Sequence, residues 1–541
     1  MVLSAILLTL AFAPFGQFYL AWIGLVPWLL VVHRASSMLK AALWSWLAGT
    51  LFFGANMYWL VPVNGLGMIA LMVYCGLFWG LIAWLTRAAG LLHLRAVAAA
   101  LAIAAVWTAG EYVRAHLFTG LPLLFFGDTQ TPILPMCQIA DTLGVYGVSF
   151  WLVSLNVLGA LLLIRGASRK LLPDAAVLAA LTAASLAYGV WRMDQTATTP
   201  GPMVMVVQSN DPQSNKGEKS MSDEELLKFH LDTTRQELAR LGGKPGTVNL
   251  SVWSETVMPP LNHQIHEIEY TMLAHNSEMA IQGISALAAE NRMGVLTGAR
   301  YWDKFHWIDM DGEQVKFPAD QRNSAYLFQP DGTFGDGPGE RYDKIHLVPF
   351  GEFIPFKHSI PFLYRLFLWL GPHYYAEYEL QDGSDNGLTV FALRNAAGAQ
   401  AWRFVTPICF EDGDSALCAA MFRPGADGRK RADFIVNITN DGWFTGGENA
   451  QHLQSAVFRS IENRVPQARS VNTGISGFVD SVGHISNVVP VRTAGANTAQ
   501  LLLDDRLSPY TRWGDWFAWM CVIFSGGAAT AAYGRRFFHG A

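Results

Sequence analysis

The chain has 541 residues, of which 51% are apolar and only 15% are charged, whereas soluble proteins carry about 25% charged residues. Together with a mean hydropathy of +0.23, this composition indicates a membrane protein with a soluble part. The formal net charge of −5 provides no broad basic surface that could neutralise phosphate backbones, so nucleic acid is excluded as an expected partner.

Cysteines and histidines give no sign of a metal site. The chain has five cysteines, an odd number, without a CxxC motif or a repeating spacing. Neither a disulfide framework nor a zinc cage is therefore predicted. His263 and His266 could share one helix face, but without further ligands nearby we interpret them as surface residues. We expect no metal and no cofactor.

Apolar stretches long enough to cross a bilayer recur through the first 191 residues and return once near the C-terminus. A membrane-spanning helix needs about 17 to 25 such residues. The first stretch is shorter and ends in Ala-Phe-Ala, which imitates a signal-peptidase site, but no Lys or Arg precedes it as in a signal sequence. We interpret it as a retained first helix. The eight predicted spans cover residues 2–13, 16–33, 41–60, 66–86, 96–113, 144–164, 172–191 and 513–533.

The cations of the connecting segments predict the orientation of the chain, because Lys and Arg are enriched on the cytoplasmic side of membranes. With a cytoplasmic N-terminus, nine cations lie inside and only Arg114 lies outside. The large segment between the seventh and eighth spans then lies outside the cytoplasmic membrane. The nine inside residues are Arg34, Lys40, Arg87, Arg95, Arg165, Arg169, Lys170, Arg535 and Arg536.

Glu111 and Arg114 lie near the end of the fifth predicted span, three residues apart, where the two side chains could pair. Ionisable groups in or near hydrocarbon are costly and favour a functional interpretation. The simpler alternative is an ion pair at the water boundary, and the role of these two residues stays open at this point.

Between residues 203 and 490 the pattern changes to short β-rich runs separated by turns and a few helical stretches. A linker is predicted at residues 192–202, and helices are predicted at 223–241, 278–291 and 449–464. Strands with intervening helices are typical of a layered α/β or α+β domain, here of about 300 residues. Strands are predicted at 203–208, 248–253, 293–299, 325–329, 388–393, 402–410, 433–438, 467–472, 475–480 and 484–489.

Three segments at predicted strand ends carry groups that suit covalent catalysis: Glu255, then Lys344 with Glu352, then Cys409 with Glu411. A cysteine nucleophile needs a base to take its proton, and a carboxylate can be that base if burial raises its pKa. A lysine can neutralise the oxyanion that forms when a thiolate attacks a carbonyl. Each residue alone is a weak indication, and sequence separation cannot show that they converge.

Several motifs together identify a family. The segments around the three strand ends resemble the carbon-nitrogen hydrolase (nitrilase) superfamily, and the whole chain, from first to last predicted helix, resembles its membrane branch, the bacterial apolipoprotein N-acyltransferases. The strings that carry the resemblance, in family order, are VVQSNDPQ, WSETVMP, YDKIHLVPFGEFIPF, ICFED, NITNDGWF and QHLQSAVFRSIENRVPQARSVNTGISGFVDSVG.

This resemblance implies a fold, a domain order and a catalytic triad. The fold is a polytopic α-helical membrane domain of about eight spans joined to an extracytoplasmic α/β nitrilase-like αββα sandwich. The residues that match the family's base, lysine and nucleophile are Glu255, Lys344 and Cys409. The domains expected are a seven-helix transmembrane domain at 1–191, a catalytic domain at 192–512, and a last helix with a cytoplasmic tail at 513–541.

Further residues match positions that support the family's site. Glu352 matches a second glutamate that helps to position the lysine, and Glu411 and Trp443 fall where the family has supporting residues. Phe410 stands where some members have tyrosine. This difference puts only a hydroxyl contact in doubt, because its backbone N–H could still serve the oxyanion.

The resemblance also implies a two-step acyl transfer at the bilayer. A phospholipid donates a fatty acyl chain to the cysteine, and the thioester is then attacked by the free α-amine of the S-diacylglyceryl-cysteine of an apolipoprotein. The expected location is the bacterial cytoplasmic (inner) membrane, with the catalytic domain on the periplasmic side. Nothing in the sequence requires more than a monomer.

Residues 355–375 are rich in exposed-looking aromatic and leucine side chains, which settle readily at membrane interfaces. We interpret the segment as a membrane-facing lid, with Phe367, Leu368 and Trp369 as candidate substrate contacts. The alternative is an ordinary loop that covers the core.

Two rival functions stay open. A membrane-tethered amidase acting on a small soluble amide would use the same triad, but it would not need eight spans. A catalytically inactive scaffold would not need Glu255, Lys344 and Cys409 together.

Overall fold

The computed structural model describes residues 1–166, 169–212, 220–267, 271–310, 313–370, 379–444 and 446–539. The chain divides into two compact units. The helical unit contains Met1–Thr196, Thr445–Asn463 and Ser508–Ala541, and the sandwich unit contains Ala197–Phe444 and Arg464–Leu507. Residues 371–375 of the predicted lid lie outside the described residues.

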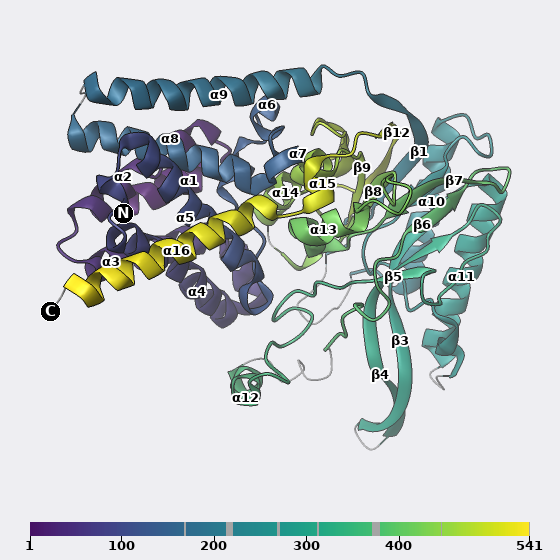
Figure 1. Ribbon diagram of the computed structural model, residues 1–541. Helices are drawn as coiled ribbons and strands as arrows, with labels where there is room; N and C mark the ends of the chain where they lie inside the picture. The colour runs from purple at the N-terminus through teal and green to yellow at the C-terminus, as the bar shows by residue number, and fades with distance from the viewer. Residues whose placement is uncertain are drawn as a thin grey trace. The chain divides into compact units, whose positions relative to one another are not determined.

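Six of the eight predicted spans form long helices of the helical unit, whereas residues 2–13 and 16–33 form only short helices, with a 3-10 turn at Phe18–Trp22 (Figure 1). Within the described residues, six helices are long and apolar enough to cross a membrane, and two at the N-terminus are shorter. The polytopic helical domain is thereby confirmed. The eight helices are α1 (Val2–Ala11), α2 (Val26–Arg34), α3 (Met38–Asn56), α4 (Val61–Ala88), α5 (Ala96–His116), α8 (Val145–Arg165), α9 (Leu172–Met193) and α16 (Trp516–His539).

Shorter helices complete the helical unit. They are α6 (Leu134–Cys137), α7 (Ala140–Leu143), α14 (Glu448–Asn463) and α15 (Pro509–Trp513). The helix predicted at 449–464 is α14, and it begins one residue earlier than predicted.

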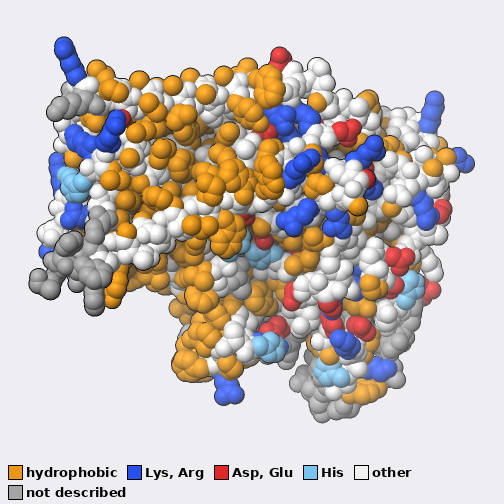
Figure 2. All heavy atoms as spheres, viewed as in Figure 1, with side chains coloured by type: hydrophobic (Ala, Val, Ile, Leu, Met, Phe, Trp, Pro, Cys, Tyr) orange, Lys and Arg blue, Asp and Glu red, His pale blue; other side chains and the backbone are white. Residues whose placement is uncertain are grey.

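Many apolar side chains of the helical unit are exposed, and Figure 2 shows them gathered on one face. Leu39 and Ile523, for example, are 76% and 71% exposed. Soluble monomers rarely expose continuous apolar patches of this kind, so the surface suits lipid. Inside the unit, α3 and α4 approach closely because Gly49 and Gly76 face each other's helices, and a Cβ on Gly76 would lie 2.4 Å from the Thr50 hydroxyl.

The alternative that Glu111 and Arg114 pair with each other is wrong. Both side chains are buried, and no ion pair between them occurs among the residues that the structure describes. Glu111 Oε1 accepts hydrogen bonds from the Trp107 indole at 3.1 Å and from the Phe126 backbone N–H at 2.8 Å. Arg114 donates to the Leu121 carbonyl at 2.7 Å.

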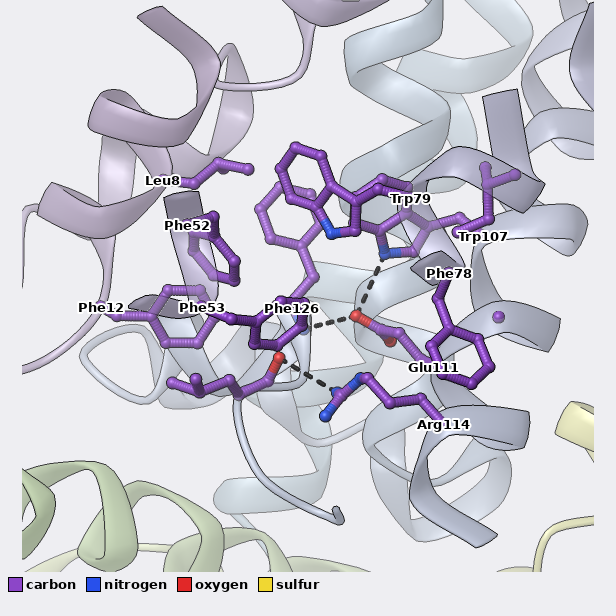
Figure 3. A pocket seen from close by; sticks show the side chains of 13 residues that line it. Leu8, Phe12, Phe52, Phe53, Phe78, Trp79, Trp107, Glu111, Arg114 and Phe126 are labelled. Atoms are coloured by element: carbon purple, nitrogen blue, oxygen red, sulfur yellow. Dashed lines mark hydrogen bonds between the residues drawn. The ribbon is translucent and has the colours of Figure 1, made fainter. Parts of the chain in front are cut away.

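Partners of both side chains lie in the segment after α5, so the spacing of residues along α5 could not predict these contacts. The two side chains hold the chain that follows α5, and they line a cavity whose other walls are mainly aromatic (Figure 3). The aromatic residues around it are Phe12, Phe52, Phe53, Phe78, Trp79, Trp107 and Phe126.

The sandwich unit contains two sheets within its described residues, and their orders are β12-β1-β2-β3-β4-β5 and β11-β10-β9-β8-β7-β6. Alternate apolar side chains of both sheets share one buried core, for example Val204 and Leu296 with Phe404 and Ile435. The strands are β1 (Thr198–Gln208), β2 (Leu250–Val252), β3 (Gly294–Met310), β4 (Glu313–Phe328), β5 (Arg341–Asp343), β6 (Phe391–Arg394), β7 (Gln400–Val405), β8 (Phe434–Thr439), β9 (Gln467–Val471), β10 (Ser476–Val479), β11 (Ile485–Val489) and β12 (Gly495–Asp504).

Helices α10 (Asp223–Arg240) and α11 (Thr271–Asn291) cover the outer face of the first sheet, where Leu227 and Ile284 pack against Met205. The parallel pair β7–β8 needs a crossover connection, which α13 (Ser415–Phe422) supplies within the sandwich unit. The predicted αββα architecture is thereby confirmed.

Some element boundaries differ from the prediction. Residues 198–202, expected in a linker, belong to β1, and residues 198–200 pair with β12. The short β5 and the partly polar β12 were not predicted, because three residues give no periodicity and an edge strand needs no continuous apolar face. Strand β7 ends at Val405, so Cys409, which was predicted inside a strand at 402–410, lies four residues beyond the observed strand.

Candidate active site

Glu255 lies three residues after β2, at the edge where the first sheet ends. The chain turns sharply there, since Thr256 has a φ of 49°, which is rare for residues other than glycine. Gly298 on the neighbouring β3 permits the turn: a Cβ at this position would lie 2.6 Å from the Glu255 Cα. The Glu255 side chain is 6% exposed, so its position is set by the packing around it.

Lys344 follows β5 directly, and its ammonium lies between two carboxylates. Its Nζ is 3.3 Å from Glu255 Oε1 and 2.9 Å from Glu352 Oε1. The other oxygen of Glu352 accepts the Val348 N–H at 2.8 Å. The structure therefore brings three residues singled out in the sequence into direct contact.

Two asparagines complete the surroundings of Glu255, and neither was singled out from the sequence. The side chain of Asn323 on β4 donates to Glu255 Oε1 at 2.7 Å and to Glu352 Oε1 at 2.9 Å. The backbone N–H of Asn440 donates to Glu255 Oε2 at 2.7 Å. Asn440 belongs to the recognised string NITNDGWF, but Asn323 has no such signal beyond being a polar residue at the start of the apolar run SAYLF.

Cys409 lies four residues after β7 of the second sheet and begins a 3-10 turn, Cys409–Gly413. Its φ is 53°, a strained left-handed conformation for a residue with a side chain, and the side chain is partly exposed. Ile408 forms a bridge with Ile438, two residues before Asn440. Because Asn440 binds Glu255, the nucleophile turn lies beside the residue that contacts the candidate base.

The charges of this cluster act on the Cys409 thiol. Burial, then the Glu255 carboxylate, raises the pKa of the thiol well above its ordinary value. Burial also raises the pKa of Glu255. Although burial opposes its charge, the carboxylates of Glu255 and Glu352 raise the pKa of Lys344 well above the ordinary value. The thiol is therefore protonated at rest, so its activation needs proton transfer to a base.

Glu411 holds the nucleophile turn and the lysine segment together. One of its oxygens accepts the backbone N–H groups of Ile345 at 2.7 Å and His346 at 3.0 Å, and the Tyr342 hydroxyl at 2.9 Å. The other accepts the Ile408 N–H at 2.7 Å. Burial raises the pKa of Glu411 to about 7, against the opposing effect of these N–H groups.

The remaining candidates lie around this centre. The Phe410 ring is buried and packs edge-on against the His346 ring at 5.4 Å. Trp443 is partly exposed in the turn that follows Asn440. The site thus has aromatic residues next to both the nucleophile and the segment that binds Glu255.

The predicted lid residues lie on helix α12 (Pro361–Leu370), at the lower edge of Figure 1. The Phe367 ring packs against Phe350 at 5.1 Å, and Phe350 lies two residues before Glu352. Leu368 is half-buried. Trp369 is 78% exposed, and Figure 2 shows mostly apolar side chains over this helix.

The described residues contain no group of three or more His, Cys, Asp and Glu side chains that could hold a metal ion. His263 instead pairs with Asp336 at 2.9 Å. The side chain of His266 lies outside the described residues.

The chain is similar to two described families. Residues 4–158 match the apolipoprotein N-acyltransferase N-terminal domain, and residues 207–500 match the carbon-nitrogen hydrolase family.

Full-length relatives agree with this match. The apolipoprotein N-acyltransferase of Geobacter metallireducens is 32% identical and covers 99% of this chain and 95% of the relative. The apolipoprotein N-acyltransferase of Methylococcus capsulatus is 30% identical, and the match covers 95% of this chain and 92% of the relative. Among solved structures, an amidase from Nesterenkonia sp. matches 59% of this chain and 93% of its own at 12% identity, with a TM-score of 0.37.

Proposed function

The chain belongs to the apolipoprotein N-acyltransferases, a membrane family whose catalytic part has the carbon-nitrogen hydrolase fold, and from this premise we propose how it acylates apolipoproteins. The acyl donor is a membrane phospholipid, and the acyl chain passes through a thioester on Cys409. The acceptor is the free α-amine of the S-diacylglyceryl-cysteine at the N-terminus of an apolipoprotein.

In the first step Glu255 takes the proton from the Cys409 thiol, and the sulfur attacks an ester carbonyl of the phospholipid. A carbon–sulfur bond forms and the carbon–oxygen ester bond breaks. The proton passes from Glu255 to the departing alkoxide, which leaves as a lysophospholipid. Lys344 and a backbone N–H of the nucleophile turn, that of Phe410, stabilise the oxyanion.

In the second step the unprotonated amine attacks the thioester carbonyl. A carbon–nitrogen bond forms, the carbon–sulfur bond breaks, and Glu255 carries a proton from the amine to the departing sulfur. The enzyme returns to its starting state, and the product is an N-acylated lipoprotein.

The observation that carries this proposal is the buried cluster of Lys344 between Glu255 and Glu352, whose charges act on the Cys409 thiol. A buried ammonium between two carboxylates keeps its charge, so it is ready to stabilise a developing oxyanion. Glu352 then positions the lysine, and Glu411 holds the two segments that carry Lys344 and Cys409.

The helical unit and α12 support a donor taken from the bilayer. Both acyl substrates keep their chains in lipid, so an enzyme that joins them needs lipid-facing helices, as the apolar surface of the helical unit provides. In this proposal α12 dips into the interface, with Phe367, Leu368 and Trp369 as its lipid contacts and Trp443 as a further substrate contact.

We assign the chain to the bacterial inner membrane as a monomer, in the orientation that the cation distribution favours. The catalytic domain at 192–512 then lies on the periplasmic side, with the transmembrane domain at 1–191 and the last helix and tail at 513–541.

A thioester assay tests the proposal against the rival amidase. The purified enzyme is mixed with phospholipid carrying a radiolabelled acyl chain, quenched with acid, and treated with neutral hydroxylamine. We expect hydroxylamine-sensitive label on the protein and on the Cys521→Ala control, and none on Cys409→Ala. In a parallel sample without quench or hydroxylamine, addition of a diacylated lipopeptide should move the label into an amide. Hydrolysis of soluble amides without lipid labelling would instead establish the amidase.

A further inference from the structure

We propose that Asn323 is a positioning residue of this reaction: its amide group holds the carboxylates of Glu255 and Glu352 on either side of Lys344 and keeps Glu255 in the ionised form that can accept the thiol proton. This inference rests on the proposed role of Glu255 as the base.

The hydrogen bonds of Asn323 give it contacts to both carboxylates at once. Its Nδ2 lies 2.7 Å from Glu255 Oε1 and 2.9 Å from Glu352 Oε1. An amide nitrogen has two hydrogens, so each carboxylate receives one. The amide nitrogen, and not the amide oxygen, must face the two carboxylates, because an oxygen without a hydrogen cannot donate to them.

Backbone pairing also holds Asn323 next to Lys344. Strand β4 pairs with β5 so that Ser324 lies opposite Asp343, and the Lys344 N–H donates to the Asn323 carbonyl at 2.8 Å. Asn323 is 3% exposed, so its side chain has little freedom to turn away. One residue therefore contacts the base, the second glutamate and the lysine.

The charge balance explains why such a contact is needed. Two ionised carboxylates beside one ammonium leave an excess negative charge in a buried site, and like charges this close favour protonation of one carboxyl group. Burial and the Glu352 charge raise the pKa of Glu255, while Lys344 and the hydrogen bond from Asn323 lower it. A neutral donor to both carboxylates stabilises their ionised forms without adding a charge.

Loss of the Asn323 amide therefore changes the protonation of the base as well as its position. A protonated glutamate cannot take a proton from the thiol, so the reaction should require a higher pH. A purely structural asparagine would alter stability or the rate at every pH to the same extent, without moving the pH profile.

The test measures the pH dependence of two reactions in wild type, Asn323→Ala and Asn323→Ser. The first is single-turnover thioester formation from labelled phospholipid, and the second is alkylation of Cys409 by iodoacetamide. For Asn323→Ala we expect the acid limb of both profiles to move up by about one pH unit, with rates at pH 6 about tenfold lower and recovery at high pH. Asn323→Ser, which keeps one donor, should lie between.

Asn262→Ala is the matched control. Asn262 is also fully buried in the sandwich unit and donates two side-chain hydrogen bonds, to Gln264 and to the Trp302 carbonyl. Its loss should lower the melting temperature but leave both pH profiles in place. An unshifted profile for Asn323→Ala, or an equal loss of rate at all pH values, would overturn the inference.

The two reactions separate this inference from the proposed function. If wild type forms no thioester, the proposed function fails, yet the iodoacetamide profile still reports whether Asn323 controls the base beside Cys409. If Asn323→Ala does not fold, Asn323→Ser with its intermediate shift decides the question.

Discussion

Glu411 accepts a hydrogen bond of 2.7 Å from the backbone N–H of Ile345. Glu411 lies two residues after the candidate nucleophile Cys409, and Ile345 directly follows the candidate lysine Lys344. This one bond therefore joins the segments that carry the two residues, which come from different sheets. The same carboxylate binds the Ile408 N–H on the other side of the nucleophile.

Replacement of Glu411 by alanine should abolish thioester formation and destabilise the sandwich unit. Three backbone N–H groups and the Tyr342 hydroxyl would lose their acceptor, and each unsatisfied buried group costs about 1–3 kcal/mol. Thermal unfolding of the purified protein measures this loss. Glu224→Ala, at an exposed position of α10, is the control and should unfold like wild type.

Glu411 should also make stability depend on pH. Burial raises its pKa from 4.5 to about 7 in the folded protein, so the stability that it contributes is fully present below about pH 4.5 and is lost as the pH rises toward 7. Glu411→Gln removes the titration. The melting temperature of wild type minus that of Glu411→Gln should therefore fall between pH 4.5 and 7, and a difference that rises with pH would contradict the pKa direction.

Lys344→Met should lower the rate of thioester formation by a factor of about 10² to 10³ or more, because the oxyanion loses its cation. The two carboxylates would remain buried without their ammonium, which also costs about 3–5 kcal/mol of stability. Single-turnover labelling below the melting temperature separates the two effects. Lys304→Met changes an exposed lysine of the same unit and should leave labelling unchanged.

Replacement of Phe367, Leu368 and Trp369 by serine should weaken acyl transfer from phospholipid vesicles but leave alkylation of Cys409 by iodoacetamide intact. The apolar face of α12 would no longer be favoured at a membrane interface. Trp307→Ser is the matched control, since Trp307 is 51% exposed on the β3–β4 hairpin of the same unit. Equal turnover of vesicles by the triple variant and wild type would favour the core-covering loop.

Arg114→Met should lower the melting temperature of the helical unit without changing alkylation of Cys409 at lower temperature. The carbonyl groups of Leu121 and Leu124 would lose a buried donor, at a cost of about 2–5 kcal/mol for the two. Lys40→Met, at an exposed position, is the control. A melting temperature equal to that of wild type would show that Arg114 does not hold the 121–126 segment.

The sequence by itself determined the elements whose signal is local. Six apolar stretches of bilayer length became long helices near the positions predicted, because hydrophobic burial depends on the side chains of one continuous segment. Most strands of the sandwich unit were found in the same way, from alternating or continuous apolar runs. Strand β5 was missed because three residues give no periodicity, and the edge strand β12 was missed because it depends on pairing with β1, which is far away in the chain.

Only the tertiary structure decided which polar groups meet. Glu255, Asn323 and Lys344 come from separate strands, and their contacts depend on strand register and on a close approach of β3 that a glycine permits. The same holds for Glu111 and Arg114, whose partners lie beyond the helix that carries them. Hydrogen bonds act over about 3 Å, so they depend on distances in space that spacing along the chain does not determine.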